Sequence, residues 1–555
     1  MNAVAPQAEP ASALRRVRQV AAVLTRHGLA DVGGALGFRS GRVLPRRRQA
    51  DSTLTRPARL RLAFEELGPT FVKFGQALSL RPDLVAPSLV AELAKLQDHA
   101  QPLPPGQAEA VLEAQFHRPV RALFSTFDAE PFAAGSMAQV HRATLPAGDV
   151  VAVKIRRPGI AALIDADLEI LRQLAQFIDR HLPGFGVMDP VGLVDEFART
   201  IRHEQDLTRE ARNIQRCAQN FAGDAAVHLP KVYGDLTTTA VLTLEFIDGL
   251  KVSELARRDV SPFVRQLVAR RGADAMLRQY LEHGFFHADP HPGNIFVLPD
   301  HVIAFLDFGM VGRLDADLRD ALARVIRAVA MRDADRLARL ALEIAETRGD
   351  TDVRALRQDL AALIATYGDV AIGDLSLGGV LRDVVNAAAK HQLRLPSNLM
   401  LLIKSVVTIE SVGRDLDPAF KMVEHARPMA ERVWRAQHSP QVLAPRAIRA
   451  TRRSIELLAD LPRQADGLLR KARDGRLEVQ FVHRNLDHFV REMDRSSNRL
   501  SFAVVIAAIL IGSSLVMHAG SQGAAGYPTL GLAGFVIAGV LGVGLAIGIV
   551  RSGRL

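Results

Sequence analysis

Long stretches of the chain carry apolar residues three and four positions apart, which is the spacing of an amphipathic helix. Within the first of them, the pair Gly68-Pro69 predicts that one helix ends and the next begins, because proline is accepted in the first turn of a helix but not in its interior. Another, residues 190–221, predicts one long helix. The stretches with this spacing are residues 56–130, 190–221, 254–286, 316–331 and 332–437.

Between these stretches, short apolar runs bounded by turn-forming residues predict strands. One of them reads Val-Val-Ala-Val-Lys-Ile and follows a loop of small residues that leads into an earlier strand. Helical stretches and groups of short strands therefore alternate along the chain. The predicted strands include residues 150–155, 227–233, 240–246, 295–297 and 302–305, the last two forming a β-hairpin around Pro299-Asp300.

The end of the chain is apolar throughout. Residues 501–519 and 529–550 contain no Asp, Glu, Lys or Arg, and each run is long enough to cross about 30 Å of hydrocarbon as a helix. Arginines flank the outer end of each run, so the positive-inside rule places both ends of a two-helix transmembrane hairpin on the cytoplasmic side. The flanking arginines are Arg495, Arg499, Arg551 and Arg554.

Small residues recur every four positions in the second apolar run, at Gly534, Ala538 and Gly542. This spacing lets two helices approach closely in lipid. The partner is either the first helix of the same hairpin, which we favour, or a second copy of the chain in a homodimer.

Charge is unevenly placed along the 555 residues, whose net charge is +10. Residues 1–60 contain 11 arginines and three acidic residues, so this segment alone supplies +8. A basic arm over residues 1–55 would bind anionic membrane lipids, or it is an ordinary solvated tail; without interleaved aromatic residues it does not favour nucleic acid. Cys217 is the only cysteine, which excludes an intramolecular disulfide and suits a reducing compartment.

The most specific chemistry lies in residues 287–309. Asp289 and Asn294 are five residues apart, and Asp307 follows thirteen residues after Asn294 in an Asp-Phe-Gly triplet. Protein kinases have the same order, in which the first Asp orients a hydroxyl group while the Asn and the second Asp hold Mg²⁺. The predicted hairpin between them would fix the two loops relative to each other. No Ala-Pro-Glu triplet or long activation segment follows, which disfavours a protein substrate.

Another reading of this region is a metal site made of histidines. His283, His287 and His291 are four residues apart and would share one face of a helix. Pro290 and Pro292 oppose a helix there, so we rank a zinc site below the nucleotide site.

Two features upstream are suited to gripping nucleotide phosphates. Lys154 follows the run Val-Ala-Val, as does the kinase lysine that holds the α- and β-phosphates. A kinase also needs a helical glutamate to pair with this lysine, and Glu210 is our candidate. In one continuous helix, about 100° per residue puts Asp206 on the same face as Glu210 and turns Glu204 nearly opposite. A solvated acidic face is the alternative for these three residues.

Two further segments predict nucleotide contacts. Glu245 and Ile247 lie in the run Glu-Phe-Ile-Asp-Gly, which resembles the hinge between kinase lobes, where backbone groups would hold adenine. The loop before the lysine strand is less glycine-rich than a kinase phosphate loop, which leaves less backbone freedom over the phosphates. Its four small residues are Ala133, Ala134, Gly135 and Ser136.

The first helical stretch carries a separate pattern. Lys73 and Gln76 are three residues apart and so share a helix face, and Gly75 between them lacks a side chain, which would let another surface approach. Because Glu204 points away from Glu210 in the predicted helix, it can face these helices and pair with Lys73. The alternative is a solvated Lys/Gln pair on an ordinary amphipathic helix.

Together these motifs closely resemble the UbiB/AarF family of atypical kinase-like proteins, over roughly residues 60–330. The resemblance implies an α+β, two-lobed protein-kinase-like fold with an amino-terminal helical extension over the substrate cleft. One departure is Gly135, where many members have alanine. The segments that carry the resemblance are Lys73–Gln76 as K-x-G-Q, Ala133–His141 as the alanine-rich loop, Glu204–Asp206 as E-x-D, Glu210–Asn213 as E-A-x-N, His287–Asn294 and Asp307–Gly309.

The resemblance also implies a division of the chain and roles for its residues. Lys154, Glu210 and Asp289 would be catalytic, Asn294 and Asp307 would hold Mg²⁺, and the extension would inhibit the site through its own motif residues. The implied domains are an arm (1–55), the helical extension (56–130), an N-lobe (131–250), a helical C-lobe (251–437), an amphipathic linker (438–498) and the transmembrane hairpin (499–555). The residues implied for the extension role are Lys73, Gly75, Gln76, Glu204 and Asp206.

For function, the resemblance implies a membrane-anchored, Mg²⁺-dependent ATPase of the bacterial inner membrane that binds ATP and ADP. It implies support for ubiquinone (isoprenoid quinone) biosynthesis, with quinone precursors and the enzymes of that synthesis as partners. Two alternatives stay open: a phosphotransferase acting on a protein or small lipid, and a non-catalytic scaffold that senses nucleotide.

Overall fold

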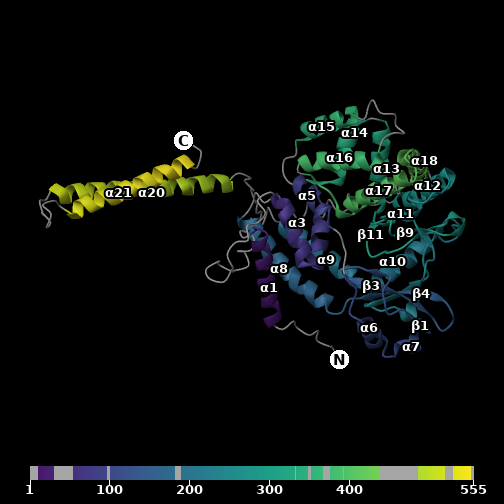
Figure 1. The fold of residues 1–555 in the computed structure, drawn as a ribbon. Helices are drawn as coiled ribbons and strands as arrows, with labels where there is room; N and C mark the ends of the chain where they lie inside the picture. The colour runs from purple at the N-terminus through teal and green to yellow at the C-terminus, as the bar shows by residue number, and fades with distance from the viewer. Residues whose placement is uncertain are drawn as a thin grey trace, which may run out of the picture. The chain divides into compact units, whose positions relative to one another are not determined.

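A computed structural model describes most of the chain. The chain forms two compact units, Met1–Pro445 and Arg446–Leu555. Figure 1 shows the ribbon coloured from the N-terminus to the C-terminus. Most of the predicted linker, residues 438–485, and much of the predicted arm lie outside the described residues. The described residues are 10–29, 54–96, 101–181, 189–331, 333–347, 352–366, 376–391, 393–437, 486–518 and 529–551.

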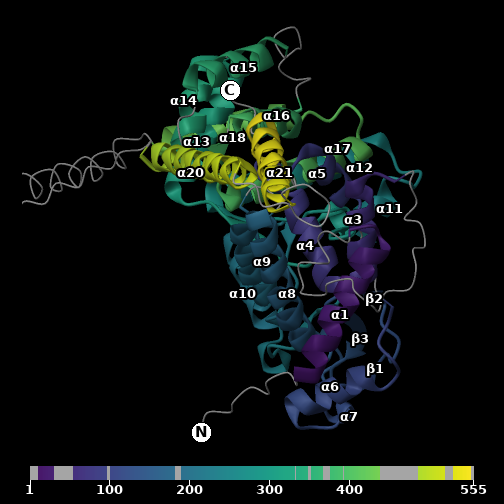
Figure 2. The same ribbon diagram turned by 90° about the vertical axis from the view of Figure 1, so that its left-hand side faces the viewer.

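Six helices drawn from three stretches of the sequence share one apolar core in the first unit, and Figure 2 shows several of them side by side. Thr55 caps the second of them by accepting from the Ala58 backbone N–H at 3.3 Å. Gly68, with a φ of 98°, ends that helix and Pro69 begins the next, so the predicted break is confirmed. The helices are α1 (Pro10–Arg26), α3 (Arg56–Leu67), α4 (Pro69–Ser79), α5 (Pro87–Leu93), α8 (Ile160–His181) and α9 (Pro190–Glu204).

Helix α1 lies in the segment that the sequence assigned to a basic arm. Val20 and Leu24 are buried in the shared core. Arg16 donates from Nε to Asp167 on α8 at 2.7 Å, and this carboxylate is fully buried. Helix α1 is therefore not a solvated tail, because its apolar face packs in the core and Arg16 pairs with a buried carboxylate. Binding of anionic lipids by the basic segment stays a prediction.

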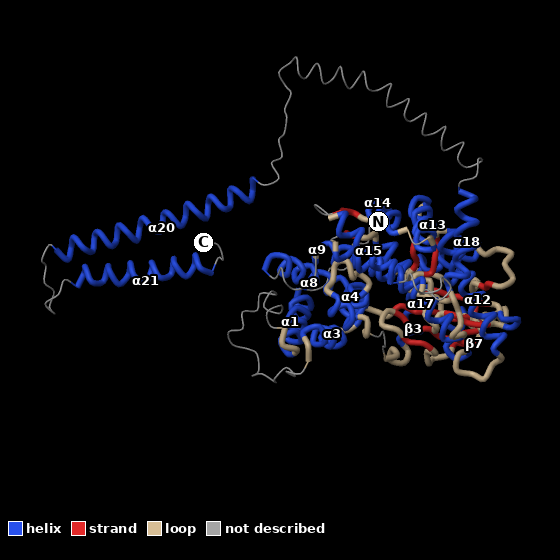
Figure 3. Tube along the Cα trace, turned by 90° about the horizontal axis from the view of Figure 1, so that it is seen from above, coloured by secondary structure: helices blue, strands red, loops and turns tan. Residues whose placement is uncertain are grey.

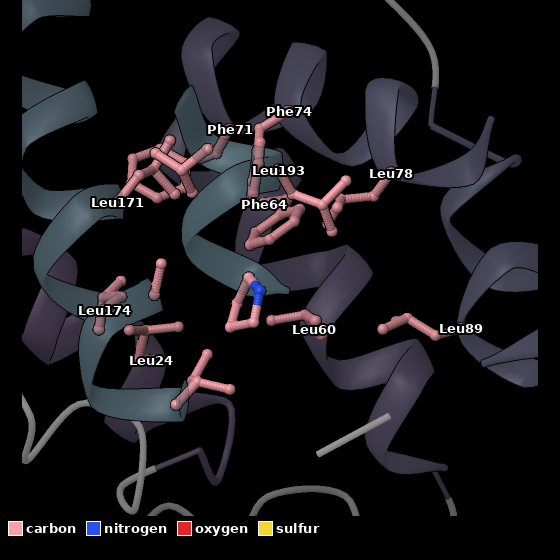
Figure 4. Close-up of a pocket in the computed structure, with 14 residues that line it drawn as sticks. Leu24, Leu60, Phe64, Phe71, Phe74, Leu78, Leu89, Leu171, Leu174 and Leu193 are labelled. Carbon is pink, nitrogen blue, oxygen red and sulfur yellow. The ribbon is translucent and has the colours of Figure 1, made fainter. Parts of the chain in front are cut away.

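The core of these helices encloses an apolar cavity of about 60 Å³. Figure 4 shows its wall, to which Leu24, Phe64 and Leu174 contribute from three different helices. A cavity lined in this way gives water no hydrogen-bond partner and therefore stays dry.

A five-stranded antiparallel sheet carries the lysine motif, in the order β1-β3-β4-β6 with β2 paired to β3. Val151, Val153 and Ile155 of β4 face α6 (Gln107–Phe116) and α7 (Val120–Leu123) in one core, so Lys154 points to the opposite side. Helix α10 (Leu207–Asn220) packs on that other side against β6. The strands are β1 (Thr126–Phe127), β2 (Ala133–Ala134), β3 (Ala138–Thr144), β4 (Val150–Arg156) and β6 (Val241–Glu245).

A second sheet has the order β5-β10-β9-β7. In the β9–β10 pair, Ile303 lies opposite Val297 and Phe305 opposite Ile295, so the predicted hairpin is confirmed. The strand predicted over residues 227–233 is present but shorter, because only its first two residues form β5. Its later part makes an isolated bridge to the other sheet. The strands are β5 (Val227–His228), β7 (Leu250–Lys251), β9 (Ile295–Val297) and β10 (Ile303–Phe305).

Helices surround this second sheet and supply the largest apolar core. Helix α12 ends in a π-helical turn, Gln279–His283, just before β8 (Phe285–His287), which pairs with β11 (Val311–Arg313). The predicted helical stretch 332–437 also contains a short strand pair, β12 (Glu346–Thr347) with β13 (Leu393–Arg394). The helices are α11 (Val252–Leu255), α12 (Pro262–Arg278), α13 (Ala316–Ala330), α14 (Ala334–Ile344), α15 (Val353–Thr366), α16 (Leu377–Lys390), α17 (Ser397–Leu416) and α18 (Met422–Gln437).

The second unit contains two packed helices, α20 (Leu486–His518) and α21 (Thr529–Arg551), which Figure 3 shows side by side. A Cβ atom added to Gly534 would overlap Ser513 of α20, and Ala538 is almost fully buried. The predicted packing of these two small residues within the hairpin is therefore confirmed, whereas Gly542 has open space around it.

Among the described residues, one helical segment is long and apolar enough to cross a membrane. It is Leu500–His518, with a mean hydropathy of 2.5. The apolar segment found in α21, Gly531–Gly544, is shorter.

Candidate functional site

Lys154 lies between two carboxylates. Its Nζ donates to both carboxylate oxygens of Glu210 at 2.9 Å and to Oδ1 of Asp307 at 3.2 Å. Lys154 extends from β4, Glu210 from the first turn of α10, and Asp307 follows β10. Three segments that are far apart in the sequence thus meet at one ammonium group.

The charges in this cluster shift one another's proton affinity. Lys154 holds the pKa of Asp307 well below its ordinary value, and Lys73 adds to this effect. Burial raises the pKa of Glu210 to about 7, while Lys154 opposes that shift. Burial disfavours the charged form of Lys154, yet the two carboxylates keep its pKa above the ordinary value. The ammonium group is therefore charged at neutral pH and could hold a phosphate group.

The single helix predicted over residues 190–221 is wrong, because the structure has two. Helix α9 ends at Glu204, and Asp206 caps α10 by accepting from the backbone N–H and the hydroxyl of Thr208 at 3.0 and 2.7 Å. The Asp206 carboxylate is used in this cap and does not stand beside Glu210 on a continuous helix face.

The β9–β10 hairpin brings the two predicted metal ligands to one end. Asn294 precedes β9, Asp307 lies two residues after β10, and the register pairs Ile295 with Phe305 between them. The Leu306 backbone N–H donates to the Asn294 carbonyl at 2.9 Å and closes this end. Asp307 has a φ of 60°, which is uncommon for a residue other than glycine, and its side chain is 52 % exposed.

Phe308, the residue after Asp307, is fully buried and held by two contacts. Its ring centroid lies 4.8 Å from that of His287, and its carbonyl accepts from Nδ2 of Asn213 on α10 at 3.0 Å. Asn213 is part of the E-A-x-N segment, but no role was predicted for it. Its place three residues after Glu210, on the same helix face, is the signal that would have assigned one.

His287 is buried and fully hydrogen-bonded. Its Nε2 donates to the Leu306 carbonyl at 2.9 Å, its Nδ1 accepts from the Asp289 backbone N–H at 3.1 Å, and burial lowers its pKa, so the ring is neutral. In the part of the chain that the structure describes, no group of three His, Cys, Asp or Glu side chains could hold a metal ion. The alternative of a zinc site at His283, His287 and His291 is therefore wrong.

The loop of small residues is a tight turn. Its two alanines form β2, and the Gly135 N–H donates to the Ala138 carbonyl at 2.9 Å. Arg157 donates from Nε to the Gly135 carbonyl at 2.9 Å, and Ser136 is buried. A Cβ atom at Gly135 would make only an ordinary contact of 3.5 Å, so alanine would fit there. Both backbone polar groups of Gly135 are bonded, which removes the freedom that its lack of a side chain offers.

The segment predicted to be the hinge runs from one sheet to the other. Glu245 ends β6, and its carboxylate accepts from Nε2 of His228 in β5 and from the Lys231 backbone N–H, both at 3.0 Å. Ile247 is buried two residues later, before β7 begins. The Glu245 side chain thus links the two sheets by hydrogen bonds. The backbone groups of this segment therefore remain the candidates for binding adenine.

The extension motif is only partly brought together. Lys73 donates from Nζ to Oε1 of Glu204 at 2.6 Å, so their predicted pairing is confirmed. Gln76 donates instead to the Leu96 carbonyl at 3.2 Å, within the helices of the extension. A Cβ atom at Gly75 would overlap Leu96, so the predicted close approach is confirmed, and the approaching surface is the extension itself.

Asp289 makes a contact that the sequence did not predict. Its Oδ1 lies 2.8 Å from Nζ of Lys404 on α17. The next residue, Ser405, is fully buried and donates to the His287 carbonyl at 2.7 Å. No local pattern connects α17 with a loop more than a hundred residues upstream.

Comparison with known proteins identifies the family of this site. The family model described as the ABC1 atypical kinase-like domain matches residues 95–341, which contain the whole Lys154 cluster. The family model described as the UbiB helical domain matches residues 360–421. The model described as the ABC1/UbiB kinase-like C-terminal domain matches residues 484–551. A probable protein kinase UbiB of Pseudomonas putida is 36 % identical over 444 residues, which are 78 % of this chain and 82 % of the relative. The chain belongs to the UbiB family of ABC1 atypical kinase-like proteins.

Other similar proteins span comparable lengths. A probable protein kinase UbiB of Aeromonas hydrophila is 32 % identical over 516 residues, covering 91 % of this chain and 92 % of the relative. The solved Rv3197–erythromycin complex from Mycobacterium tuberculosis has 24 % identity and a TM-score of 0.46, covering 67 % of this chain and 90 % of that one. The predicted family is confirmed, and the mixed fold agrees with its kinase-like domain.

We expect the Lys73–Glu204 pair to contribute to the stability of this UbiB family member. Both side chains are mostly buried, at 19 and 22 % exposure, so Lys73→Met leaves a carboxylate without this partner at a cost of about 1–3 kcal/mol. The thermal unfolding midpoint should fall by several degrees. Lys95→Met is the matched control, because Lys95 also pairs at 2.6 Å but is 60 % exposed. Equal midpoints for the two variants would contradict this expectation.

Proposed function

We propose that this protein binds ATP with Mg²⁺ and transfers the γ-phosphoryl group to water, as a membrane-anchored ATPase that supports ubiquinone biosynthesis. The observation that carries the proposal is the Lys154 cluster, in which one charged ammonium is shared by a helical glutamate and the Asp of the Asp-Phe-Gly triplet. Kinase-like catalysis requires these partners together. Relatives named probable protein kinase UbiB support the biological role.

The residues present fit a magnesium ion. Mg²⁺ in nucleotide enzymes is held by oxygen ligands, usually one or two carboxylates together with substrate phosphates. Asp307 offers a half-exposed carboxylate and Asn294 an amide oxygen at the same end of the hairpin. When bound there, Mg²⁺ would neutralise charge on the phosphate oxygens.

The chain's own groups would then do the remaining work. The Lys154 ammonium would hold the α- and β-phosphates by charge, and Glu210 would keep that ammonium in place. Asp289 would orient the attacking water and accept its proton. Backbone groups near Ile247 would hold adenine, and the turn at Gly135 would lie over the phosphates.

A phosphotransferase is the second candidate. The presence of Asp289 permits it, because the same carboxylate can orient an acceptor hydroxyl group. The short path after the triplet disfavours a protein acceptor: β11 begins at Val311 and α13 at Ala316, so there is little chain for docking a peptide. A small lipid acceptor remains compatible with this geometry.

The deciding experiment follows the γ-phosphate of labelled ATP with the purified full chain, Mg²⁺ and anionic liposomes carrying a quinone precursor. Label released as free phosphate supports the ATPase. Label on protein or lipid identifies a phosphotransferase instead. Bound ATP that stays intact favours a scaffold that senses nucleotide.

Membrane anchoring is part of the proposal. Helices α20 and α21 would form a hairpin in the bacterial inner membrane, with the rest of the chain in the cytoplasm, where anionic lipids, quinone precursors and the enzymes of quinone synthesis would meet it. Packing of Gly534 against Ser513 supports a hairpin within one chain over a homodimer seam at this position.

Charge in the middle of the helices should release the protein from membranes. Leu510 in α20 and Val540 in α21 are 38 and 68 % exposed, and arginine near the centre of a span costs about 2.5–3.5 kcal/mol. We expect Leu510→Arg with Val540→Arg to move the protein into the carbonate-soluble fraction. Met493→Arg, at an exposed position of α20 before its apolar segment, should stay in the pellet. A double variant that sediments like the wild type contradicts the anchor.

A further inference from the structure

The charges around Asp289 are not balanced by its own loop. The stretch from Asp289 to Asn294 reads Asp-Pro-His-Pro-Gly-Asn and contains no lysine or arginine. Lys154 is already held by Glu210 and Asp307. Phosphoryl transfer places negative charge on the oxygens of the moving group, and enzymes meet this charge with cations held in position.

Lys404 supplies a cation at this place from a distant helix. Its Nζ lies 2.8 Å from Oδ1 of Asp289, and the two side chains are 28 and 36 % exposed. Both charged groups therefore remain accessible to a ligand that enters beside Asp289. An ion pair with this exposure adds little stability by itself, because water competes for both partners.

Helix α17 is fixed against the catalytic loop by a buried chain of hydrogen bonds next to Lys404. The Tyr280 hydroxyl donates to Oγ of Ser405, which in turn donates to the His287 carbonyl, both at 2.7 Å. All three residues are almost fully buried. Ser405 thus fixes the position of α17 along the loop. The backbone that carries Lys404 is therefore held in place beside Asp289.

We propose that Lys404 is a catalytic residue that pairs with Asp289 before nucleotide binds and contacts the γ-phosphate when ATP is present. The proposal rests on the proposed function. In the transfer step, an acceptor oxygen forms a bond to the γ-phosphorus while the bond to the β,γ-bridging oxygen breaks. The acceptor proton moves to Asp289, and ADP leaves with the electron pair. The Lys404 ammonium keeps its proton and stabilises the charge on the transferring group.

The first test compares ATP with ADP in one variant. If Lys404 contacts the γ-phosphate, Lys404→Met should weaken ATP binding at least about tenfold while ADP binding stays close to that of the wild type. Because both affinities are measured on one sample, their ratio does not depend on the fraction that is folded. The kcat for γ-phosphate release should fall about 10²–10³-fold, and Lys404→Arg should restore part of both losses. Lys390→Met, which removes an exposed ion pair of the neighbouring helix α16, is the control and should change neither quantity.

A second test separates this role from simple positioning of Asp289. If Lys404 only held Asp289, its removal would have no effect on ATP binding once Asp289 is replaced by Asn. We expect Lys404→Met to weaken ATP binding in the Asp289→Asn background as well. An unchanged ATP-to-ADP ratio in either background overturns the proposal. Wild-type protein that binds ATP without turnover contradicts only the ATPase, since the ratio still reports on Lys404; wild-type protein that binds neither nucleotide overturns both.

Discussion

Replacing Asp307 with Asn is expected to lower γ-phosphate release at least about 10²-fold. The substitution removes a charge that pairs with Lys154 at 3.2 Å and that is the carboxylate offered to Mg²⁺. The fold should survive, because asparagine tolerates the left-handed backbone at this position, where φ is 60°. Release of labelled phosphate and the Mg²⁺ dependence of ATP binding measure the effect.

The matched control for this variant lies at the other end of the same hairpin. Asp300 has a φ of 57°, so Asp300→Asn makes the same chemical change in the same backbone conformation, away from Lys154. We expect near wild-type turnover from this control. If Asp307→Asn retained full turnover with an unchanged Mg²⁺ requirement, the carboxylate would not be the metal ligand and the proposed site would be wrong.

Replacing Gly312 with Ala is expected to lower the free energy of unfolding by about 1–3 kcal/mol. A Cβ atom at Gly312 would overlap the ring of Phe286, which is fully buried and lies opposite it in the β8–β11 pair. The ring cannot turn away into solvent, so the strands must shift. Because β8 leads directly to Asp289, turnover should fall together with the thermal unfolding midpoint.

Gly272→Ala is the control for the loss of glycine in a buried place. Gly272 lies inside α12, and a Cβ atom there meets nothing within 4 Å. Alanine should therefore leave the midpoint unchanged or raise it, since alanine is favoured over glycine in a helix by up to about 1 kcal/mol. A Gly312→Ala protein as stable as the wild type would show that β8 can shift without cost.

In the proposed mechanism, the phosphates and the acceptor would be held by different parts of the kinase-like region. Lys154, which we propose to hold the phosphates, extends from the five-stranded sheet and is positioned by Glu210 of α10. Asp289, whose carboxylate would orient the acceptor, contacts Lys404 of α17. Helix α17 lies in the stretch matched by the UbiB helical domain. Under these proposed roles, a change in the position of α17 would alter phosphoryl transfer without altering ADP binding.

Sequence alone determined the elements whose structure is local. The β9–β10 hairpin follows from two apolar runs around Pro299-Asp300, and it places Asn294 and Asp307 at one end whatever surrounds it. The break at Gly68-Pro69 follows from backbone chemistry. The strand that ends near Lys154 follows from alternation, since one face of β4 is buried and the lysine lies on the other.

Tertiary structure decided the rest, because a periodic pattern does not state which partner an apolar face or a charge will find. Helix α9 ends at Glu204 and Asp206 caps α10, where periodicity alone predicted a continuous helix. Helix α1 packs into a core, and its Arg16 pairs there with Asp167, far along the chain. Lys404 reaches Asp289 only because α17 folds back onto the loop. Contacts between residues this distant depend on how whole elements pack, and no local spacing in the sequence encodes that packing.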